Sequence, residues 1–126
     1  MNTLTIKKTE YTPDIVMDAD KQLISIVGDS FPENTYDFYK PVIKWMEAYF
    51  SLSLKSLTTI TMEINYFNSS SSQLFFDFFD ILEAAVRDGQ KIEVNWVYTP
   101  KNESALEAGE DFAEEFESIT INMVKK

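Results

Sequence analysis

Regular alternation of strand-like and helix-like runs limits the fold of this chain more than any other feature. Residues Leu57–Tyr66 and Lys91–Tyr98 alternate apolar and polar side chains, which is the two-residue period of a β-strand. Between them, a run from about Ser71 to Asp88 has the three- and four-residue apolar spacing of a helix, and Gly89 is a good stop for it. A strand–helix–strand order favours a sheet with helices packed against it. The side chains expected to share one strand face are Ile60, Met62, Ile64 and Tyr66, and the expected core stripe of the helix is Phe75, Phe78, Phe79, Leu82, Ala85 and Val86.

The other predicted elements extend this alternation over the whole chain. In chain order they are a strand with Leu4 and Ile6, a hairpin of Ile15–Met17 and Leu23–Val27, a helix from Asn34 or Thr35 to about Phe50, an acidic helix Asn102–Glu117 that Gly109 weakens or splits, and a strand with Ile119 and Ile121. The order β-β-β-α-β-α-β-α-β predicts an α/β fold with a mixed β-sheet and helices packed against it. We expect one domain over residues 1–126, because a chain of this length can bury an independent core.

Composition excludes several classes of function. The net charge of −10 disfavours nucleic acid and anionic membrane surfaces as partners, and no run is apolar enough for membrane insertion. The chain contains neither Cys nor His, which excludes disulfides, thiol nucleophiles, zinc sites and His-based catalysis. The first residues have no apolar signal core, so we expect a cytoplasmic protein. Because no His is available as a base and no catalytic motif is found, we expect a protein that is not an enzyme and needs no cofactor.

Four adjacent hydroxyls, Ser69–Ser72, lie where a predicted strand meets a helix N-terminus. Ser70 and Gln73 fit a capping box, in which each side chain bonds the backbone N–H of the other. A helix N-terminus also favours a negative charge, so a phosphate attached there is electrostatically accepted. The two interpretations are compatible if Ser70 caps the helix while Ser69 stays exposed.

Three aromatic side chains are candidate partner anchors. Phe76 falls among polar residues one turn beyond the serines, so it is either exposed or turned into the core. Trp45 and Tyr49 belong to an unusually wide apolar arc on the first helix, and either pack in the core or help form a groove for a partner helix.

Two polar segments allow both a purely structural and a functional interpretation. Ser30, Glu33 and Asn34 either form an ordinary turn and helix cap or flank the serine run, because loops at one end of a sheet cluster. Residues 103–117 hold seven acids and no base, which is typical of a solvated helix face and also suits a docking site for a basic partner.

Several short motifs, in the same order over nearly the whole chain, together resemble the SiaC family of bacterial regulatory phosphoproteins. They are Thr12-Pro13, the loop of residues 28–34, Phe38-Tyr39-Lys40-Pro41 with Trp45, the stretch of residues 66–71, Trp96-Val97-Tyr98 and Gly109-Glu110-Asp111-Phe112.

The resemblance implies a STAS-like fold, similar to anti-sigma-factor antagonists, and a partner-switching function. A Ser/Thr protein kinase would phosphorylate the hydroxyl that follows Asn68, which is Ser69, and a PP2C-type phosphatase would remove the phosphate. The unphosphorylated form would bind and activate a diguanylate cyclase and so raise cyclic di-GMP. The family usually has Thr in place of Ser69 and often Lys in place of Gln73, and Ser70 and Ser71 are alternate acceptors.

Two other functions suit the residues alone. An acidic small-ligand or anion-binding module would use the Ser69–Ser72 helix N-terminus as a reversible site and would need a concave pocket there. A structural subunit would use exposed aromatic surface to form a permanent homodimer.

Overall fold

All nine predicted elements are present in the computed structural model, which describes residues 1–52 and 56–126. In that part of the chain the elements are β1 (Leu4–Ile6), β2 (Asp14–Asp18), β3 (Leu23–Ser30), α1 (Thr35–Phe50), β4 (Thr58–Phe67), α2 (Ser69–Arg87), β5 (Ile92–Tyr98), α3 (Glu103–Glu115) and β6 (Thr120–Lys125). The predicted order is therefore confirmed.

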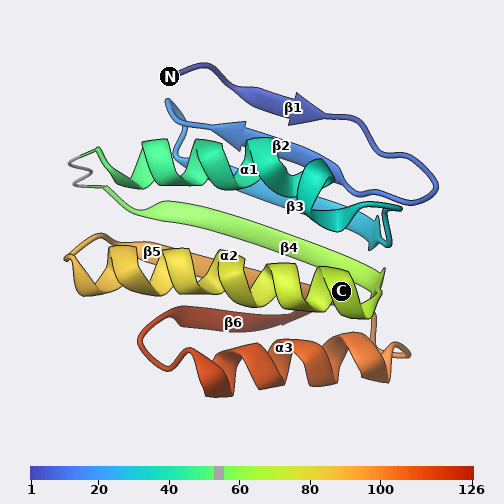
Figure 1. Cartoon of the computed structure of the whole chain (residues 1–126). Coiled ribbons are helices and arrows are strands. Elements are labelled where there is room, and N and C mark those ends of the chain that lie inside the picture. The colour runs from blue at the N-terminus through green and yellow to red at the C-terminus, as the bar shows by residue number, and fades with distance from the viewer. Residues whose placement is uncertain (53–55) are drawn as a thin grey trace.

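Among the described residues, the strands form one mixed sheet in the order β1-β2-β3-β4-β5-β6. The pairs β1–β2 and β2–β3 are antiparallel, whereas β3, β4, β5 and β6 run parallel to one another. Each parallel strand lies next to the previous one, so successive crossovers of one hand put their helices on the same face. Figure 1 shows α1, α2 and α3 side by side on that face. The predicted α/β fold class is confirmed.

The core lies between this helix layer and one face of the sheet. Every second side chain is buried along β3, from Thr58 to Ile64 of β4 and from Ile92 to Trp96 of β5, as their two-residue period predicts. The helix that supplies most of the aromatic packing is α2, and its predicted stripe is confirmed: Phe75, Phe78, Phe79, Leu82 and Ala85 are buried and Val86 packs against them.

Gly109 does not split the acidic helix, because α3 runs unbroken from Glu103 to Glu115. A Cβ atom at Gly109 would lie 2.5 Å from Cδ1 of Trp96 and 2.6 Å from Cε of Met123, far inside van der Waals contact. The indole Nε1–H of Trp96 donates a 2.9 Å hydrogen bond to the Ala105 carbonyl of the same helix. The glycine therefore lets α3 approach β5 and β6 closely, which outweighs its low helix propensity.

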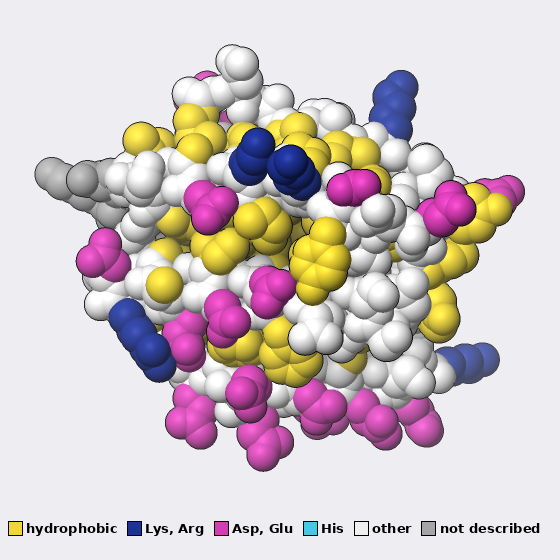
Figure 2. All heavy atoms as spheres, in the orientation of Figure 1, with side chains coloured by type: hydrophobic (Ala, Val, Ile, Leu, Met, Phe, Trp, Pro, Cys, Tyr) yellow, Lys and Arg dark blue, Asp and Glu magenta, His cyan; other side chains and the backbone are white. Residues whose placement is uncertain are grey.

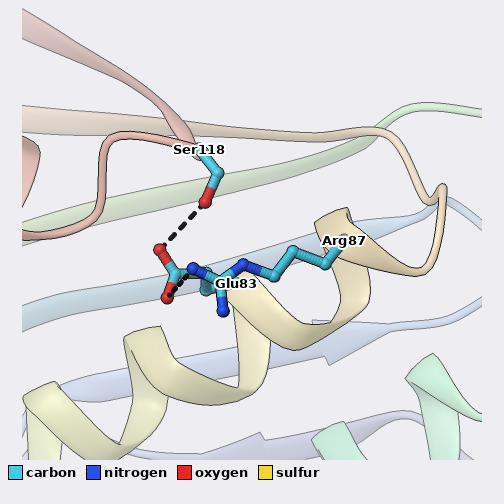
Figure 3. Close-up of polar contacts among 3 residues, drawn as sticks. All are labelled: Glu83, Arg87 and Ser118. Atoms are coloured by element: carbon cyan, nitrogen blue, oxygen red, sulfur yellow. Dashed lines mark hydrogen bonds and ion pairs between the residues drawn. The ribbon is translucent and has the colours of Figure 1, made fainter.

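A polar bridge ties the far end of α2 to the turn before β6. Glu83 accepts a 2.9 Å hydrogen bond from the Ser118 hydroxyl and forms a 3.3 Å ion pair with Arg87 one helical turn away (Figure 3). Both contacts are solvent-exposed, so their contribution to stability is small. The three helices are therefore held in place mainly by their core packing against the sheet.

Candidate functional site

Helix α2 begins at Ser69, directly after an asparagine that caps it. Asn68 has extended backbone angles, and its side-chain oxygen accepts a 2.9 Å hydrogen bond from the Ser71 N–H. The Asn68 N–H donates to the Ser30 carbonyl at 3.1 Å, so the cap is held by the end of β3. The predicted capping box of Ser70 and Gln73 is wrong, because Asn68 occupies the cap position and the serines lie inside the first turn.

The four serines differ sharply in accessibility. Ser69 and Ser70 are exposed, Ser72 is half-buried and Ser71 is completely buried. The Ser71 hydroxyl lies 2.8 Å from the hydroxyl of Ser30. Ser71 is therefore wrong as an alternate phosphoacceptor in this conformation, whereas Ser69 and Ser70 offer free access to an enzyme. Gln73 is exposed on the next turn.

A buried chain of three hydroxyls lies beneath the exposed serines. It runs from Ser71 through Ser30 to the phenol of Tyr39 on α1, with a distance of 2.7 Å between the Ser30 and Tyr39 oxygens. All three residues are fully buried, and burial raises the pKa of Tyr39 to about 12, although the Ser30 hydrogen bond acts in the opposite direction. Ser30 therefore lies beside the serine run, which is one of the two interpretations that the sequence left open for it. The sequence did not single out Tyr39 for this role, because its position matches an ordinary apolar helix position.

The end of β4 contains a bulge that turns Tyr66 away from the core. Gly28 pairs with Ile64, but the next residue, Asp29, pairs with Tyr66, so Asn65 is the extra residue. Tyr66 was predicted to continue the inward row of Ile64; that prediction is wrong, since Tyr66 is 56% exposed. The carbonyl of Asn65 accepts a 2.9 Å hydrogen bond from Asn102, the cap residue of α3.

The two remaining loop residues lie at the same end of the sheet. Asn34 caps α1, accepting a 3.2 Å hydrogen bond from the Asp37 N–H, as one of the two predictions for it stated. Glu33 is exposed and lines a hollow with Tyr11 and Phe31. Neither aromatic was predicted as a site residue from the sequence, since neither belongs to a periodic run.

Of the three predicted partner anchors, one lies at the surface. Phe76 is 37% exposed, and its inner edge packs on Phe112 and Phe116 of the α3 region, with ring centroids 5.1 and 6.0 Å away. Trp45 and Tyr49 are wrong as exposed anchors, because Trp45 is only 8% exposed and Tyr49 is fully buried. Their polar atoms are satisfied inside the fold, Trp45 Nε1–H by the Asn2 carbonyl and the Tyr49 hydroxyl by Thr58.

The surroundings of the α2 N-terminus do not form a strong anion pocket. Asn68 already accepts hydrogen bonds from the N–H groups of Ser71 and Ser72, which leaves at most those of Ser69 and Ser70 for an anion. A hollow of about 240 Å³ beside Ser72 has two carboxylates in its lining, those of Glu107 and Asp111. The acids of residues 103–117 are exposed, and Figure 2 shows acidic side chains crowded along the lower edge, over α3.

The described part of the chain has neither a cluster of metal-ligating side chains nor a membrane-spanning helix. In residues 1–52 and 56–126 we find no group of acidic side chains arranged to hold a metal ion. None of the helices in this part of the chain is long and apolar enough to cross a membrane.

Comparison with known proteins identifies close relatives. Residues 6–126 match the model of the SiaC family regulatory phosphoproteins. An uncharacterised protein of Pseudomonas aeruginosa (strain UCBPP-PA14) is 34% identical over 115 residues, covering 91% of this chain and 90% of its own. The solved structure of SiaC of Pseudomonas aeruginosa superposes with a TM-score of 0.91 at 29% identity and covers all of both chains.

A second solved structure contains a partner. It is the crystal structure of the diguanylate cyclase SiaD in complex with its activator SiaC from Pseudomonas aeruginosa; the matched chain is 31% identical, with a TM-score of 0.91, and the match covers 98% of this chain and 99% of that one. The family match and the whole-length structural agreement both cover the junction between β4 and α2, the buried chain of hydroxyls and the helix layer. The chain therefore belongs to the SiaC family of regulatory phosphoproteins.

Proposed function

We propose that this protein is a non-catalytic partner switch of the cytoplasm, controlled by reversible phosphorylation of Ser69. In this scheme a Ser/Thr protein kinase adds the phosphate and a PP2C-type phosphatase removes it. The observation that carries the proposal is the exposed Ser69 hydroxyl at the first position of α2, immediately after the cap residue Asn68. Membership of a family of regulatory phosphoproteins supports it.

The local geometry is suited to a modification that leaves the fold intact. The Ser69 side chain takes part neither in the Asn68 cap nor in the buried contact between Ser71 and Ser30. A phosphate brings about −1.5 to −2 charge at neutral pH, which the positive end of α2 tolerates. The change therefore acts on the surface and on whatever contacts it.

We infer that the partner controlled in this way is a diguanylate cyclase. The relative SiaC is described as the activator of the diguanylate cyclase SiaD, and it matches this chain over nearly its whole length. Phe76, exposed nearly two helical turns beyond Ser70, supplies an apolar anchor on the same side of α2 as the acidic residues of α3. A phosphate inside such an interface would be desolvated without a compensating charge, so binding weakens.

The test uses three forms of the full chain: unmodified, carrying phosphoserine at position 69, and carrying phosphoserine at position 70 as the matched control. Each is titrated against the diguanylate cyclase of the same host, and cyclic di-GMP synthesis is measured in parallel. We expect the unmodified chain to bind and raise cyclase activity, and phosphoserine at position 69 to weaken binding by at least about tenfold. The position-70 form shows a smaller effect.

Two outcomes would overturn the proposal. One is equal binding and activation by the unmodified chain and the form with phosphoserine at position 69. The other is that no form binds the cyclase while the isolated protein binds inorganic phosphate at the α2 N-terminus, which would favour an anion-binding module.

A further inference from the structure

Three aromatic side chains from distant parts of the chain form a surface cluster beside the α2 N-terminus. The ring of Phe31 packs edge-on against Tyr11 on one side and Tyr66 on the other, with centroid distances of 5.4 and 5.5 Å. Tyr11 is 55% exposed and Tyr66 is 56% exposed, so the cluster presents its rings to solvent. Figure 2 shows hydrophobic and acidic side chains together at the right-hand edge, the end of the sheet where β3 and β4 finish.

Backbone hydrogen bonds join this cluster to the start of α2, which carries the proposed phosphorylation site Ser69. The Phe31 N–H donates to the Tyr11 carbonyl at 2.8 Å, and the neighbouring Ser30 carbonyl accepts from the Asn68 N–H at 3.1 Å. The loop that carries Tyr11 is itself fixed, because the Thr9 hydroxyl accepts hydrogen bonds from the N–H groups of Tyr11 and Thr12, each at 3.1 Å. The aromatic surface is therefore pre-organised, and it lies on the same hydrogen-bonded framework as Ser69.

The hollow in this surface combines two aromatic rings with one carboxylate. It has a volume of about 410 Å³ and is lined by Tyr11, Phe31 and Glu33. Two ion pairs form among residues 1–52 and 56–126, and Glu33 belongs to neither of them. Aromatic rings attract a cation over their faces, and a carboxylate beside them binds the same cation by a charge-assisted hydrogen bond.

We propose that this hollow receives an arginine side chain of the diguanylate cyclase, an inference that rests on the function proposed above. A guanidinium group stacks on aromatic rings and binds a carboxylate through two N–H groups, which a lysine ammonium does not do. The net charge of −10 adds a general attraction for a basic partner surface. The volume is ample for one long side chain.

The same contact explains how a phosphate on Ser69 weakens binding instead of strengthening it. A guanidinium held between Tyr11, Phe31 and Glu33 is already paired and fixed in place. It is then not free to neutralise a phosphate on Ser69, which the docked partner would cover and desolvate. The pocket thus supplies affinity and orientation, and Ser69 supplies the control.

The experiment is a double-mutant cycle on the complete proteins. Glu33→Gln removes the charge at constant shape, and Tyr11→Leu removes the π face while keeping an apolar side chain at an exposed position. Binding to the host's diguanylate cyclase is measured by calorimetry for each variant and for the pair. Asp20→Asn, an exposed acid in the turn before β3, is the control for a general loss of negative charge.

Each single variant is expected to weaken binding by about tenfold. The double variant should weaken it by clearly less than the product of the two effects, because both residues contact one guanidinium. Asp20→Asn should bind as the unaltered chain does. Among cyclase variants with single surface arginines changed to alanine, one should lose affinity for the unaltered chain but little for Glu33→Gln.

Unchanged binding by folded Glu33→Gln and Tyr11→Leu, or strictly multiplicative effects with no coupled cyclase arginine, would overturn the pocket proposal. If those variants bind normally while phosphoserine at position 69 still weakens binding, the pocket alone is refuted. If the unaltered chain does not bind the cyclase at all, the proposed function itself fails, and the pocket proposal fails with it.

Discussion

Replacing the cap residue Asn68 separates the stability of α2 from the control of partner binding. Asn68→Ala removes the 2.9 Å hydrogen bond to the Ser71 N–H, a partly buried bond whose donor residue is fully buried. A lost N-cap costs about 1 kcal/mol and a buried unsatisfied donor about 1–3 kcal/mol, and because the two describe one interaction we expect a total of about 1–2 kcal/mol. Asn68→Asp retains a cap of equal strength and adds a favourable charge at the positive end of the helix.

The assay is urea and thermal unfolding of the isolated protein, followed by circular dichroism. Asn68→Ala should lower the melting temperature by about 4–8 °C for this chain length, and Asn68→Asp should leave it within about 2 °C. In the binding assay we expect the opposite ranking of the two variants, because the new carboxylate lies next to Ser69. Asn68→Asp should then weaken cyclase binding more than Asn68→Ala does. Equal stability of the alanine variant and the unaltered chain would refute the assigned cap.

Two further predictions concern the packing around the site. Gly109→Ala should destabilise the fold by about 1–2 kcal/mol, because overpacking against Trp96 outweighs a propensity gain of about 1 kcal/mol; a more stable variant in urea unfolding would contradict this. The folded state raises the pKa of Tyr39 to about 12, from 10.0 in the unfolded chain, so the unfolded chain loses this proton at a lower pH. The contribution of Tyr39 to the free energy of unfolding is therefore complete below pH 10 and is lost as the pH rises through 12. Tyr39→Phe should flatten the dependence of the free energy of unfolding on pH between pH 10 and 12. It should also cost about 1 kcal/mol at pH 7, because the hydrogen bond with Ser30 is lost. An unchanged slope between pH 10 and 12 would contradict the assignment.

The sequence predicts the fold well where the signal is local and periodic. The two-residue period of Leu57–Tyr66 and Lys91–Tyr98 and the apolar stripe of the second helix each correspond to an element with the expected buried face. The start of the first helix was predicted to within one residue, because Asn34 and Thr35 are both good cap residues, and the structure selects Asn34. Such signals depend on residues within one or two turns of each other.

The details of the site depend on contacts between distant residues and could not be predicted in this way. Asn68 and the serines after it are all good cap residues, and the choice among them follows from the bond to Ser30 and the burial of Ser71. The bulge at Asn65 leaves no trace in the alternation, so Tyr66 was assigned to the wrong face. Gly109 was expected to weaken or split its helix, because the Trp96 ring that leaves no room for a Cβ atom at this position belongs to β5 and not to the helix itself.

The central claim is that Ser69 carries the regulatory phosphate, and site-mapping mass spectrometry on protein purified from its own host tests it most directly. The unaltered chain, Ser69→Ala and Ser70→Ala are compared under several growth conditions. The account predicts one phosphate on the unaltered chain and on Ser70→Ala, mapped to Ser69, and none on Ser69→Ala. A phosphate that persists in Ser69→Ala, or the absence of phosphate from every form under all conditions, would contradict it.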